Sequence, residues 1–463
     1  MTPIEQRLLA FLGADGLLAS DARGRDAHED VCHGQLGRPV AWVRPGTADE
    51  VSRVLALARD EKVAVVPVGL RTAYWRPLRF ENAIVLDACR LNAVHDPDPV
   101  HRVAWCEAGA SVRTIDDRLR AHGLALPCHP DATGDTSIGS MVATGFTSGI
   151  GMGTASIDDV IAGVELVLGT GERARLGAAA ALGAPPFVRT GLPDPTGLLF
   201  ASEGALGVLT QVAVRGRPRG HRGLVRVRLP EPPQGLLIAL RIATQLRVPG
   251  LIETARAVDR GDPRRAEPVE LDLVVHSPLG SDELAGRLRF VIDRIRAHAP
   301  SSTLEQIAES PDESRIPRFA GAPGQAWART RAGRFAPVDV NLGYDACEEA
   351  IVLSERVLDE ARKGPTLNLR RALYFAPDFV NFGLHLSLDA TKTTDADARA
   401  LMATGIEALS SLPIVPYRWG RIWGETLTPR LDPGYRACML ALKRCLDPDG
   451  ILNPGVSFFD GVT

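Results

Sequence analysis

The stretch GLLFASEGALGVLTQVAVRGRP, from Gly197 to Pro218, decides the fold. It contains a turn in which Glu203 and Gly204 stand side by side, and it continues into a β-rich run from Leu206 to Arg215. Glycine lets a backbone adopt conformations that a side chain forbids. We therefore expect a sharp turn at 203–204 that is followed directly by a strand.

Upstream of this turn, from Pro39 onward, short strands alternate with helices. Thr47 and Glu50 have the spacing of a capping box, which predicts a helix that ends near Glu61. The turn Gly169-Thr170-Gly171 indicates a hairpin. Strands are predicted at 40–43, 63–66, 83–87, 103–107, 163–168 and 206–215, and a second helix at 111–122.

The middle of the chain, from about residue 221 to 427, repeats strands and helices in an order that predicts an antiparallel sheet backed by helices. Residues 311–337 are rich in Pro, Gly and Arg and predict a long loop. Strands are predicted at 224–229, 269–276, 372–375 and 384–388, and helices at 236–246, 282–298, 396–409 and, beyond this region, 435–445.

The composition is that of a globular protein. Of its 463 residues, 45% are hydrophobic and 24% are charged, with a formal net charge of −3. This length predicts two or three domains. No run of Lys or Arg interleaved with aromatics is present, so a nucleic-acid partner is not expected. The apolar stretches are too short to span a bilayer, and the N-terminus lacks the pattern of a secretion signal.

Seven cysteines are scattered along the chain without CxxC spacing. This pattern argues against a disulfide framework and against a metal site. It is typical of a protein in the reducing cytoplasm. We therefore expect a cytoplasmic protein with no metal and no membrane partner.

Four segments stand out as sequence motifs, in this order: RPVAWVRPGTADEVSRVLALARDEKVAVVPVG (38–69), DTSIGSMVATG (135–145), the 197–218 stretch and LDPDGILNPG (446–455). In order and spacing they resemble the vanillyl-alcohol oxidase/p-cresol methylhydroxylase (PCMH-type) flavoprotein superfamily. The first motif is similar to the family's opening strand, helix and second strand, and the second to its TIGG-containing loop. The third is similar to its GSEG-containing segment, and the fourth to its C-terminal motif.

This resemblance implies an α+β fold of two domains in a bacterial FAD-dependent enzyme. Residues 1–220 are expected to form a two-subdomain PCMH-type FAD-binding domain. Residues 221–427 are expected to form a cap domain over the substrate, with an antiparallel sheet covered by helices. Residues 428–463 are expected to return to the FAD-binding domain.

The glycine turns are the expected cofactor site. Backbone N–H groups in such turns bind diphosphates, and Ser137, Ile138 and Gly139 can supply them. The alternative is that the glycines only permit turns. The residues that the resemblance implies for FAD binding are Pro67, Val68, Gly69, Leu70, Arg71, Thr72, Asp135, Thr136, Ser137, Ile138, Gly139, Ser140, Ala143, Thr144, Glu203, Gly204, Gly207, Val208 and Asn453.

The first phosphate loop departs from the family pattern, because Leu70 and Arg71 replace two glycines. Their side chains would crowd a diphosphate unless the loop is rebuilt, and positive φ is costly for them. Arg71 can instead pair with a phosphate. The alternative is a loop that has drifted, with weak or absent FAD binding.

Thr72 stands where members that link FAD covalently through this loop have a histidine. Other members attach FAD through a histidine on a cap strand ahead of a helix, and the stretch from Phe382 to Met402 resembles that strand and helix, with His385 as its only histidine. We expect FAD to be held without a covalent bond. His385 is then a substrate contact or base, and ordinary packing is its alternative role.

The segment PYRWGRIW, residues 416–423, places Tyr417 and Arg418 where phenol-oxidising relatives carry a Tyr-Arg pair for a phenolate. An arginine beside a tyrosine hydroxyl stabilises a developing anion. The alternative is a core strand of the cap. The acidic residue of those relatives falls near Ala143, so their mechanism does not transfer whole. The predicted catalytic residues are Tyr417, Arg418 and His385.

Two branches of the superfamily are disfavoured. The lactate, glycolate and hydroxyglutarate branch carries a GHxGDGNxH segment that is absent here. The berberine-bridge branch needs a phosphate-loop histidine and a cysteine just before the second loop, and Cys128 lies several residues too early. Doubly attached flavin is therefore not expected.

The resemblance implies an FAD-linked oxidoreductase, an oxidase or dehydrogenase that removes a hydride from a small organic alcohol or phenol-like substrate to flavin N5. Its partners are that substrate and an electron acceptor, oxygen or another, and a homodimer is compatible with it. One alternative is a same-fold protein that uses flavin non-oxidatively or has lost it and binds a ligand. The other is an unrelated scaffold protein.

Overall fold

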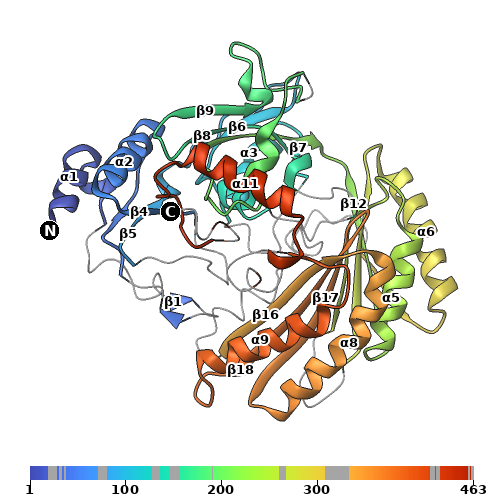
Figure 1. The fold of residues 1–463 in the computed structure, drawn as a ribbon. Coiled ribbons are helices and arrows are strands. Elements are labelled where there is room, and N and C mark those ends of the chain that lie inside the picture. Colours follow the sequence, from blue (N-terminus) through green and yellow to red (C-terminus); the bar gives the residue numbers. More distant parts are fainter. Residues whose placement is uncertain are drawn as a thin grey trace.

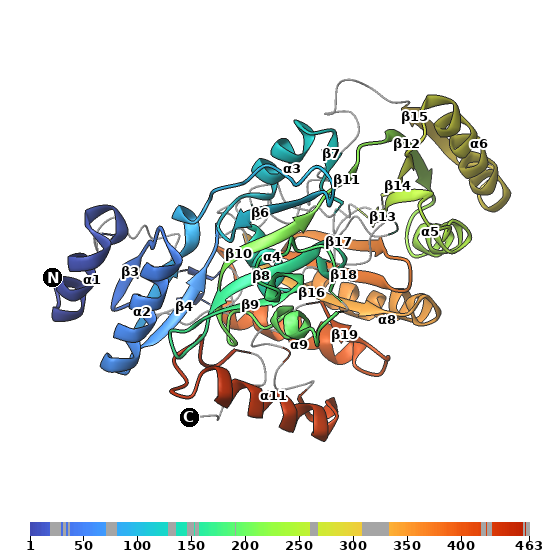
Figure 2. The same cartoon turned by 90° about the horizontal axis from the view of Figure 1, so that it is seen from above.

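Residues 1–18, 29–30, 34–35, 38–70, 81–127, 136–145, 152, 157–189, 191–259, 267–307, 333–417, 423, 428–456 and 459 are described in this computed structural model. Their strands form a three-stranded, a four-stranded and an eight-stranded sheet, besides two-stranded ribbons. Helices and mostly antiparallel sheets together confirm the predicted α+β class (Figure 1). In the perpendicular view, α1 and α6 lie at opposite ends of the molecule (Figure 2).

The N-terminal part is built on a small parallel sheet in the order β3-β5-β4. Thr47 accepts the Glu50 amide at 3.1 Å and so caps the helix that follows β3. The predicted capping box is only half formed, because the Glu50 carboxylate accepts the Gly46 amide at 2.6 Å instead. The elements are α1 (Pro3–Leu12), β3 (Ala41–Val43), α2 (Ala48–Glu61), β4 (Ala64–Val68) and β5 (Ala83–Asp87).

Next along the chain is an antiparallel sheet in the order β6-β10-β8-β9. β8 and β9 form the hairpin that Gly169-Thr170-Gly171 predicts. Buried side chains of α3 and α4 pack with this sheet in one hydrophobic cluster. The elements are β6 (Val103–Glu107), α3 (Val112–Arg120), α4 (Ile138–Ala143), β8 (Ile161–Val167), β9 (Arg173–Gly177) and β10 (Val208–Arg215).

Short ribbons and the C-terminal segment complete this part. An isolated bridge pairs Val65 of β4 with Leu452, so the end of the chain returns to the parallel sheet. None of the helices in the described ranges has the length and apolar character needed to cross a membrane. The remaining elements are β1 (Glu29–Asp30), β2 (Gly34–Gln35), β7 (Leu124–Ala125), β11 (Arg217–Pro218) and α11 (Pro433–Leu446).

The eight-stranded sheet is antiparallel throughout, in the order β15-β12-β14-β13-β17-β18-β16-β19. Helices α5, α8 and α9 run across one of its faces (Figure 1). The elements are β12 (His221–Leu229), α5 (Gln234–Gln245), β13 (Ile252–Asp259), β14 (Val269–Ser277), α6 (Ser281–His298), β15 (Thr303–Ile307), β16 (Gly333–Leu342), α8 (Tyr344–Lys363), β17 (Thr366–Phe375), β18 (Val380–Asp389), α9 (Asp395–Leu409) and β19 (Val415–Pro416).

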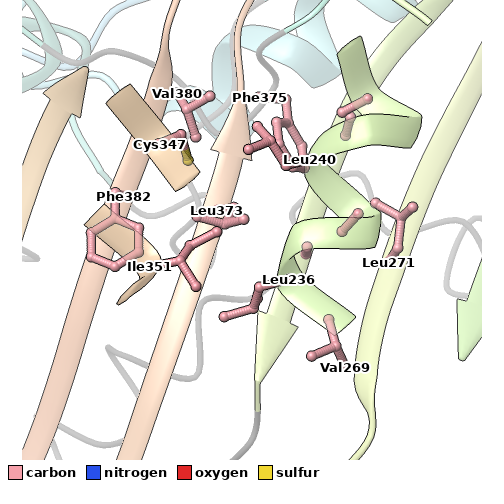
Figure 3. Close-up of a cluster of buried hydrophobic side chains, with 14 of the residues drawn as sticks. Leu236, Leu240, Val269, Leu271, Cys347, Ile351, Leu373, Phe375, Val380 and Phe382 are labelled. Carbon is pink, nitrogen blue, oxygen red and sulfur yellow. The ribbon is translucent and has the colours of Figure 1, made fainter. Parts of the chain in front are cut away.

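The helix-covered face carries the largest apolar core. Side chains of α5 and α8 meet alternate residues of the sheet there, among them Leu373, Phe375 and Phe382 (Figure 3). Because successive strand residues point to opposite faces, the residues between these ones point to the face without helices. We call this second side the helix-free face. Its side chains are largely polar, and it is described below.

One sequence prediction about this region is wrong. Residues 333–337, assigned to a loop on composition, form the first half of β16, because each of them pairs in register with a residue of β18. Residues 308–332 lie outside the described part. β13, β15 and α8 are not among the predicted elements, whereas β5 and β6 have the predicted bounds.

Candidate functional site

The first motif ends where β4 leads into Gly69. A Cβ atom placed on Gly69 would lie 2.1 Å from Ser140 Oγ and 2.2 Å from Ser137 Oγ. Close approach to the second motif therefore favours glycine here. Pro67 and Val68 precede it at the end of β4. Leu70 is partly exposed. Arg71 and Thr72 lie outside the described residues.

The second motif forms the start of α4. Ser137 is its N-cap, and the Ser137 hydroxyl donates to Ser140 Oγ at 2.8 Å. The Ile138 and Gly139 amides donate to the Ala110 and Ala108 carbonyl oxygens at 3.0 and 2.8 Å. The prediction that these two N–H groups serve a diphosphate is therefore wrong, because the loop after β6 already uses both.

Close packing explains the glycine of this motif. A Cβ atom on Gly139 would lie 2.8 Å from the Ala108 carbonyl oxygen. The polar groups that the motif presents toward Gly69 are the two hydroxyls, Ser137 and Ser140. Thr144 donates its hydroxyl to the Ser140 carbonyl at 2.7 Å, and Thr136 accepts the Val112 amide at 2.9 Å through its carbonyl. Asp135 lies outside the described residues.

The third motif makes the predicted sharp turn. Ala201, Glu203 and Gly204 have φ values of 60°, 51° and 79°, which is the left-handed region that costs a side chain energy. A Cβ atom on Gly204 would lie 2.5 Å from Pro67 Cγ. The Glu203 amide donates to the Ala143 carbonyl at 2.7 Å. The turn is thus fixed against both the first and the second motif.

The end of this turn enters β10. Gly207 has a φ of 156°, and a Cβ atom there would lie 2.5 Å from Leu166 Cδ1. Val208 pairs with Val167 in the four-stranded sheet. These two residues therefore join the turn to the sheet and keep it close to β8.

The fourth motif ties the C-terminus to the same place. The backbone N–H of Asn453 donates to the Val65 carbonyl at 2.9 Å, and its side-chain Nδ2 donates to the Glu203 carbonyl at 2.6 Å. Asn453 Oδ1 is buried and has no hydrogen-bond partner within the described ranges. An oxygen left this way in the interior is an acceptor for a bound ligand. The four sequence motifs therefore meet at one place, which we call the four-motif junction. Its residues are Gly69, Ser137, Ser140, Glu203, Gly204 and Asn453.

A buried ion pair holds the fourth motif in position. Lys443 is 3% exposed and donates to the Ala205 and Leu452 carbonyls at 2.8 and 2.9 Å, as well as to Asp447. Asp447 accepts the Leu452 amide at 2.9 Å. Burial lowers the pKa of Lys443, and the Asp447 carboxylate partly offsets this.

A second polar region lies on the helix-free face of the large sheet. The register of β17 with β18 places Arg370 opposite His385 and Tyr374 opposite Asn381. On the other side of β18, Asn341 of β16 lies opposite Asn381. All these side chains except that of Asn341 are at least nine-tenths buried. A buried polar surface of this kind is expensive to maintain and marks a place where a polar ligand can bind.

His385 is joined to an acidic residue that sequence reasoning missed. His385 Nε2 lies 2.8 Å from Asp339 Oδ1, and both side chains are buried. The Tyr417 amide donates to the Asp339 carbonyl at 3.0 Å. Two of the predicted catalytic residues thus meet at Asp339, and the third, Arg418, lies outside the described part.

Tyr417 stands at the boundary of the two cores. It packs both against the cluster of the eight-stranded sheet and against that of the four-stranded sheet. Met152, from the segment before β8, also belongs to the cluster of the eight-stranded sheet. The polar face and the four-motif junction therefore belong to structures that contact each other.

Two buried cysteines of the described ranges have strongly shifted pKa values. Burial raises the pKa of Cys106 and of Cys347 to about 12, so neither thiol is an activated nucleophile. Among the described residues, no three His, Cys, Asp or Glu side chains are grouped as a metal site requires.

The comparisons with known proteins place these features in a family. The family "FAD binding domain" matches residues 39–177. An uncharacterized FAD-linked oxidoreductase of Mycobacterium tuberculosis is 25% identical over 99% of this chain and 100% of its own. A D-2-hydroxyglutarate dehydrogenase of Xanthomonas citri pv. viticola is 30% identical over 91% of this chain and 89% of its own.

The fold is also that of a solved enzyme structure. A p-cresol methylhydroxylase with substrate bound superimposes with a TM-score of 0.79 over 99% of this chain and 96% of the other, at 16% identity. At this identity the likeness concerns the fold alone. It agrees with the family match and with the order of the four motifs.

Proposed function

Because the chain belongs to the FAD-linked oxidoreductases of the vanillyl-alcohol oxidase/p-cresol methylhydroxylase superfamily, we propose that it oxidises a small organic substrate at a carbon that bears, or is conjugated to, a hydroxyl group. The observation that carries the proposal is the buried His385–Asp339 pair beside Tyr417. A base and a hydroxyl donor at the boundary of the two cores suit the removal of a proton and a hydride from one substrate.

The four-motif junction fits FAD. Gly69 and Gly204 line it at positions where a Cβ atom would collide, and Asn453 Oδ1 offers a buried acceptor. Ser137 and Ser140 supply hydroxyls in place of the amides of Ile138 and Gly139. When bound there, FAD would supply the hydride acceptor, and oxygen or another acceptor would take up the electrons. We assign the other predicted cofactor residues to the same role.

The proposal divides the chain into two working parts. Residues 1–220 and 428–463 hold FAD, and residues 221–427 cover the substrate. The small parallel and four-stranded sheets lie wholly in the first part, and the eight-stranded sheet lies wholly in the second. The Val65–Leu452 bridge supports the return of the C-terminal segment to the first part.

His385 acts in this proposal as the base. With Nε2–H directed at the Asp339 carboxylate, a neutral ring keeps its lone pair on Nδ1, which can take the proton of a substrate hydroxyl. Asp339 then stabilises the imidazolium that forms, as an acidic partner does for a catalytic histidine. Tyr417 and Arg418 stabilise the oxygen of the substrate.

The same contact bears on how FAD is held. Asp339 orients His385 through Nε2, which favours a role in proton transfer over a role as the attachment point of the flavin. Thr72 replaces the attachment histidine of the first loop. We therefore propose FAD without a covalent bond. The cysteines in the described ranges are free, which supports a cytoplasmic enzyme.

Two substrate classes follow from the relatives. Phenol-like alcohols suit the Tyr417–Arg418 pair, whereas one relative is named D-2-hydroxyglutarate dehydrogenase. The sequence lacks the GHxGDGNxH segment of the 2-hydroxy-acid branch. We place phenol-like alcohols first and include 2-hydroxy acids in the test.

The test is an absorbance spectrum of the purified protein followed by anaerobic mixing with each candidate substrate. We expect flavin bands that bleach with at least one alcohol, alkylphenol or 2-hydroxy acid, and a yellow supernatant after acid precipitation. Protein that stays colourless after FAD is added would point to a flavin-less ligand-binding homologue. Bound flavin that dithionite reduces but no substrate does would point to a non-oxidative use of flavin.

A further inference from the structure

Arg370 of β17 is a fully buried cation, with 0% exposure. Within the described ranges, Nε and Nη1 have no hydrogen-bond partner, and Nη2 lies 3.5 Å from Tyr374 Oη, at the limit of a hydrogen bond. No carboxylate in the described part of the chain forms a salt bridge with it.

The next residue, Arg371, is also a buried arginine, but it has charged partners. Arg371 is 1% exposed and points to the opposite, helix-covered face. It donates to Asp259 Oδ2 at 3.0 and 3.1 Å and pairs with Glu355 of α8. Leaving a buried guanidinium unpaired costs much free energy. The absence of a partner at Arg370 therefore indicates that a ligand takes that place.

The neighbours of Arg370 indicate where a ligand bound to it would lie. Arg370 lies opposite His385 in the strand register. Asp339 lies in a neighbouring row, opposite Gly383, and its carboxylate is directed to His385 instead. Between them, a Cβ atom on Gly383 would lie 2.4 Å from Asp339 Oδ1, so a side chain is excluded there. A ligand that pairs with Arg370 is thereby held beside the proposed base.

We propose that Arg370 binds a carboxylate of the substrate on the helix-free face and so favours substrates that carry one. A guanidinium matches a carboxylate in shape and charge, and free N–H groups on Nε and Nη1 leave donors for it. This inference rests on the proposed function for its placement of the substrate on this face. It favours the anionic members of the substrate classes named above.

The test measures thermal unfolding of the purified protein with sodium acetate at constant ionic strength, against sodium chloride. A ligand that binds only the folded state raises Tm. We expect a saturable rise with acetate for the wild type and its loss in R370M. The control is R226M, which removes a partly exposed arginine of the same face that already pairs with Asp272 and should keep the acetate response.

The stability of the variants themselves is a second readout. Because Arg370 has no counter-charge, R370M should unfold at the same temperature as the wild type or higher without acetate, whereas R371M should unfold at a clearly lower temperature. If R370M does not fold, R370K replaces it, since lysine keeps the charge but loses the planar fork, and its acetate response should weaken.

A kinetic arm connects the site to turnover. For a carboxylate substrate, R370M should lower kcat/KM by roughly 10- to 150-fold, the value of a hydrogen bond to a charged group. An acetate response that survives in R370M, or that chloride matches, overturns the proposal. Acetate binding does not require flavin reduction, so its failure in a protein that still oxidises substrates separates this inference from the proposed function.

Discussion

Asp339 Oδ1 lies 2.8 Å from His385 Nε2 across two neighbouring strands, with both side chains buried. The register of β16 and β18 puts Asp339 opposite Gly383, so its carboxylate reaches two residues along to the histidine. Buried hydrogen bonds of this kind fix the tautomer and the orientation of an imidazole. In the proposed function, this geometry prepares His385 for proton transfer before any substrate binds.

The first prediction concerns this pair. Replacing Asp339 with Asn keeps the size of the side chain but removes the charge that stabilises an imidazolium. We expect the rate of anaerobic flavin reduction to fall by about 10²- to 10⁴-fold, and H385A to fall by a similar factor. The measurement is stopped-flow absorbance of the flavin bands across pH.

Asp345 provides the control for this prediction. It is an exposed carboxylate in the first turn of α8, a few residues after Asp339, and D345N should reduce flavin at the wild-type rate. Wild-type rates and an unchanged pH profile in D339N would mean that the pair only supports the fold.

The second prediction concerns the approach of the first motif to the second. In G69A the new methyl group meets Ser137 Oγ and Ser140 Oγ, so β4 and α4 must separate or the hydroxyls must rotate away. We expect a loss of about 1–3 kcal/mol in stability and a reduced flavin-to-protein absorbance ratio. The matched control is G197A, where nothing lies within 4 Å of the added atom; equal flavin content in both variants would contradict the prediction.

The third prediction concerns the ion pair beneath the fourth motif. K443M leaves Asp447 buried without its cation and leaves the Ala205 and Leu452 carbonyls without a donor. Breaking a buried pair on one side costs about 3–5 kcal/mol. Urea unfolding should show this loss, together with faster release of FAD. R444M removes the adjacent, exposed charge of the same helix and should change stability little; equal unfolding midpoints for the two variants would refute the assignment.

Local signals allowed much of the fold and one half of the site to be predicted. β5 and β6 are continuous apolar runs between polar turns, and such runs specify their own ends. The Glu203–Gly204 turn was predictable because glycine at that point tolerates the positive φ that the turn needs. The convergence of the four motifs followed from the family resemblance.

The other half of the site depends on contacts between strands, which local sequence does not encode. Asp339 was missed because the strand that carries it begins inside a segment whose composition suggests a loop. Its partnership with His385 exists only in the register of β16 with β18. Likewise, alternation separates Arg370 from Arg371, but only the packing of α8 shows which face is covered.

The same limit explains the wrong assignment of backbone donors. Ile138 and Gly139 have the sequence of an anion-binding turn. Whether their N–H groups are available depends on the carbonyls of Ala108 and Ala110, which come from the loop after β6. The availability of these two N–H groups therefore depends on a loop about 30 residues upstream. The sequence of the motif itself does not show that this loop accepts their hydrogen bonds.

The last prediction concerns acid stability. Asp272 accepts hydrogen bonds from Arg226 at 2.7 Å and Arg256 at 2.9 Å on the helix-free face. Burial raises the pKa of Asp272, but the hydrogen bond from Arg226 and the charges of both arginines outweigh it, so its pKa lies below the usual range. A depressed carboxyl pKa stabilises the folded state fully above the unfolded value of about 3.9, and this contribution is lost as pH falls through the folded value.

D272N removes this contribution and leaves Arg256 buried without a counter-charge, so it should cost about 3–5 kcal/mol at neutral pH. Urea midpoints measured at successive pH values should show a constant gap between wild type and D272N from pH 7 to 5. The gap should narrow only below about pH 4, where the wild-type carboxylate also takes up a proton. D293N, which changes an exposed carboxylate of α6, should show no such gap. A gap that already shrinks between pH 7 and 5 would mean that another group, and not Asp272, couples this sheet to pH.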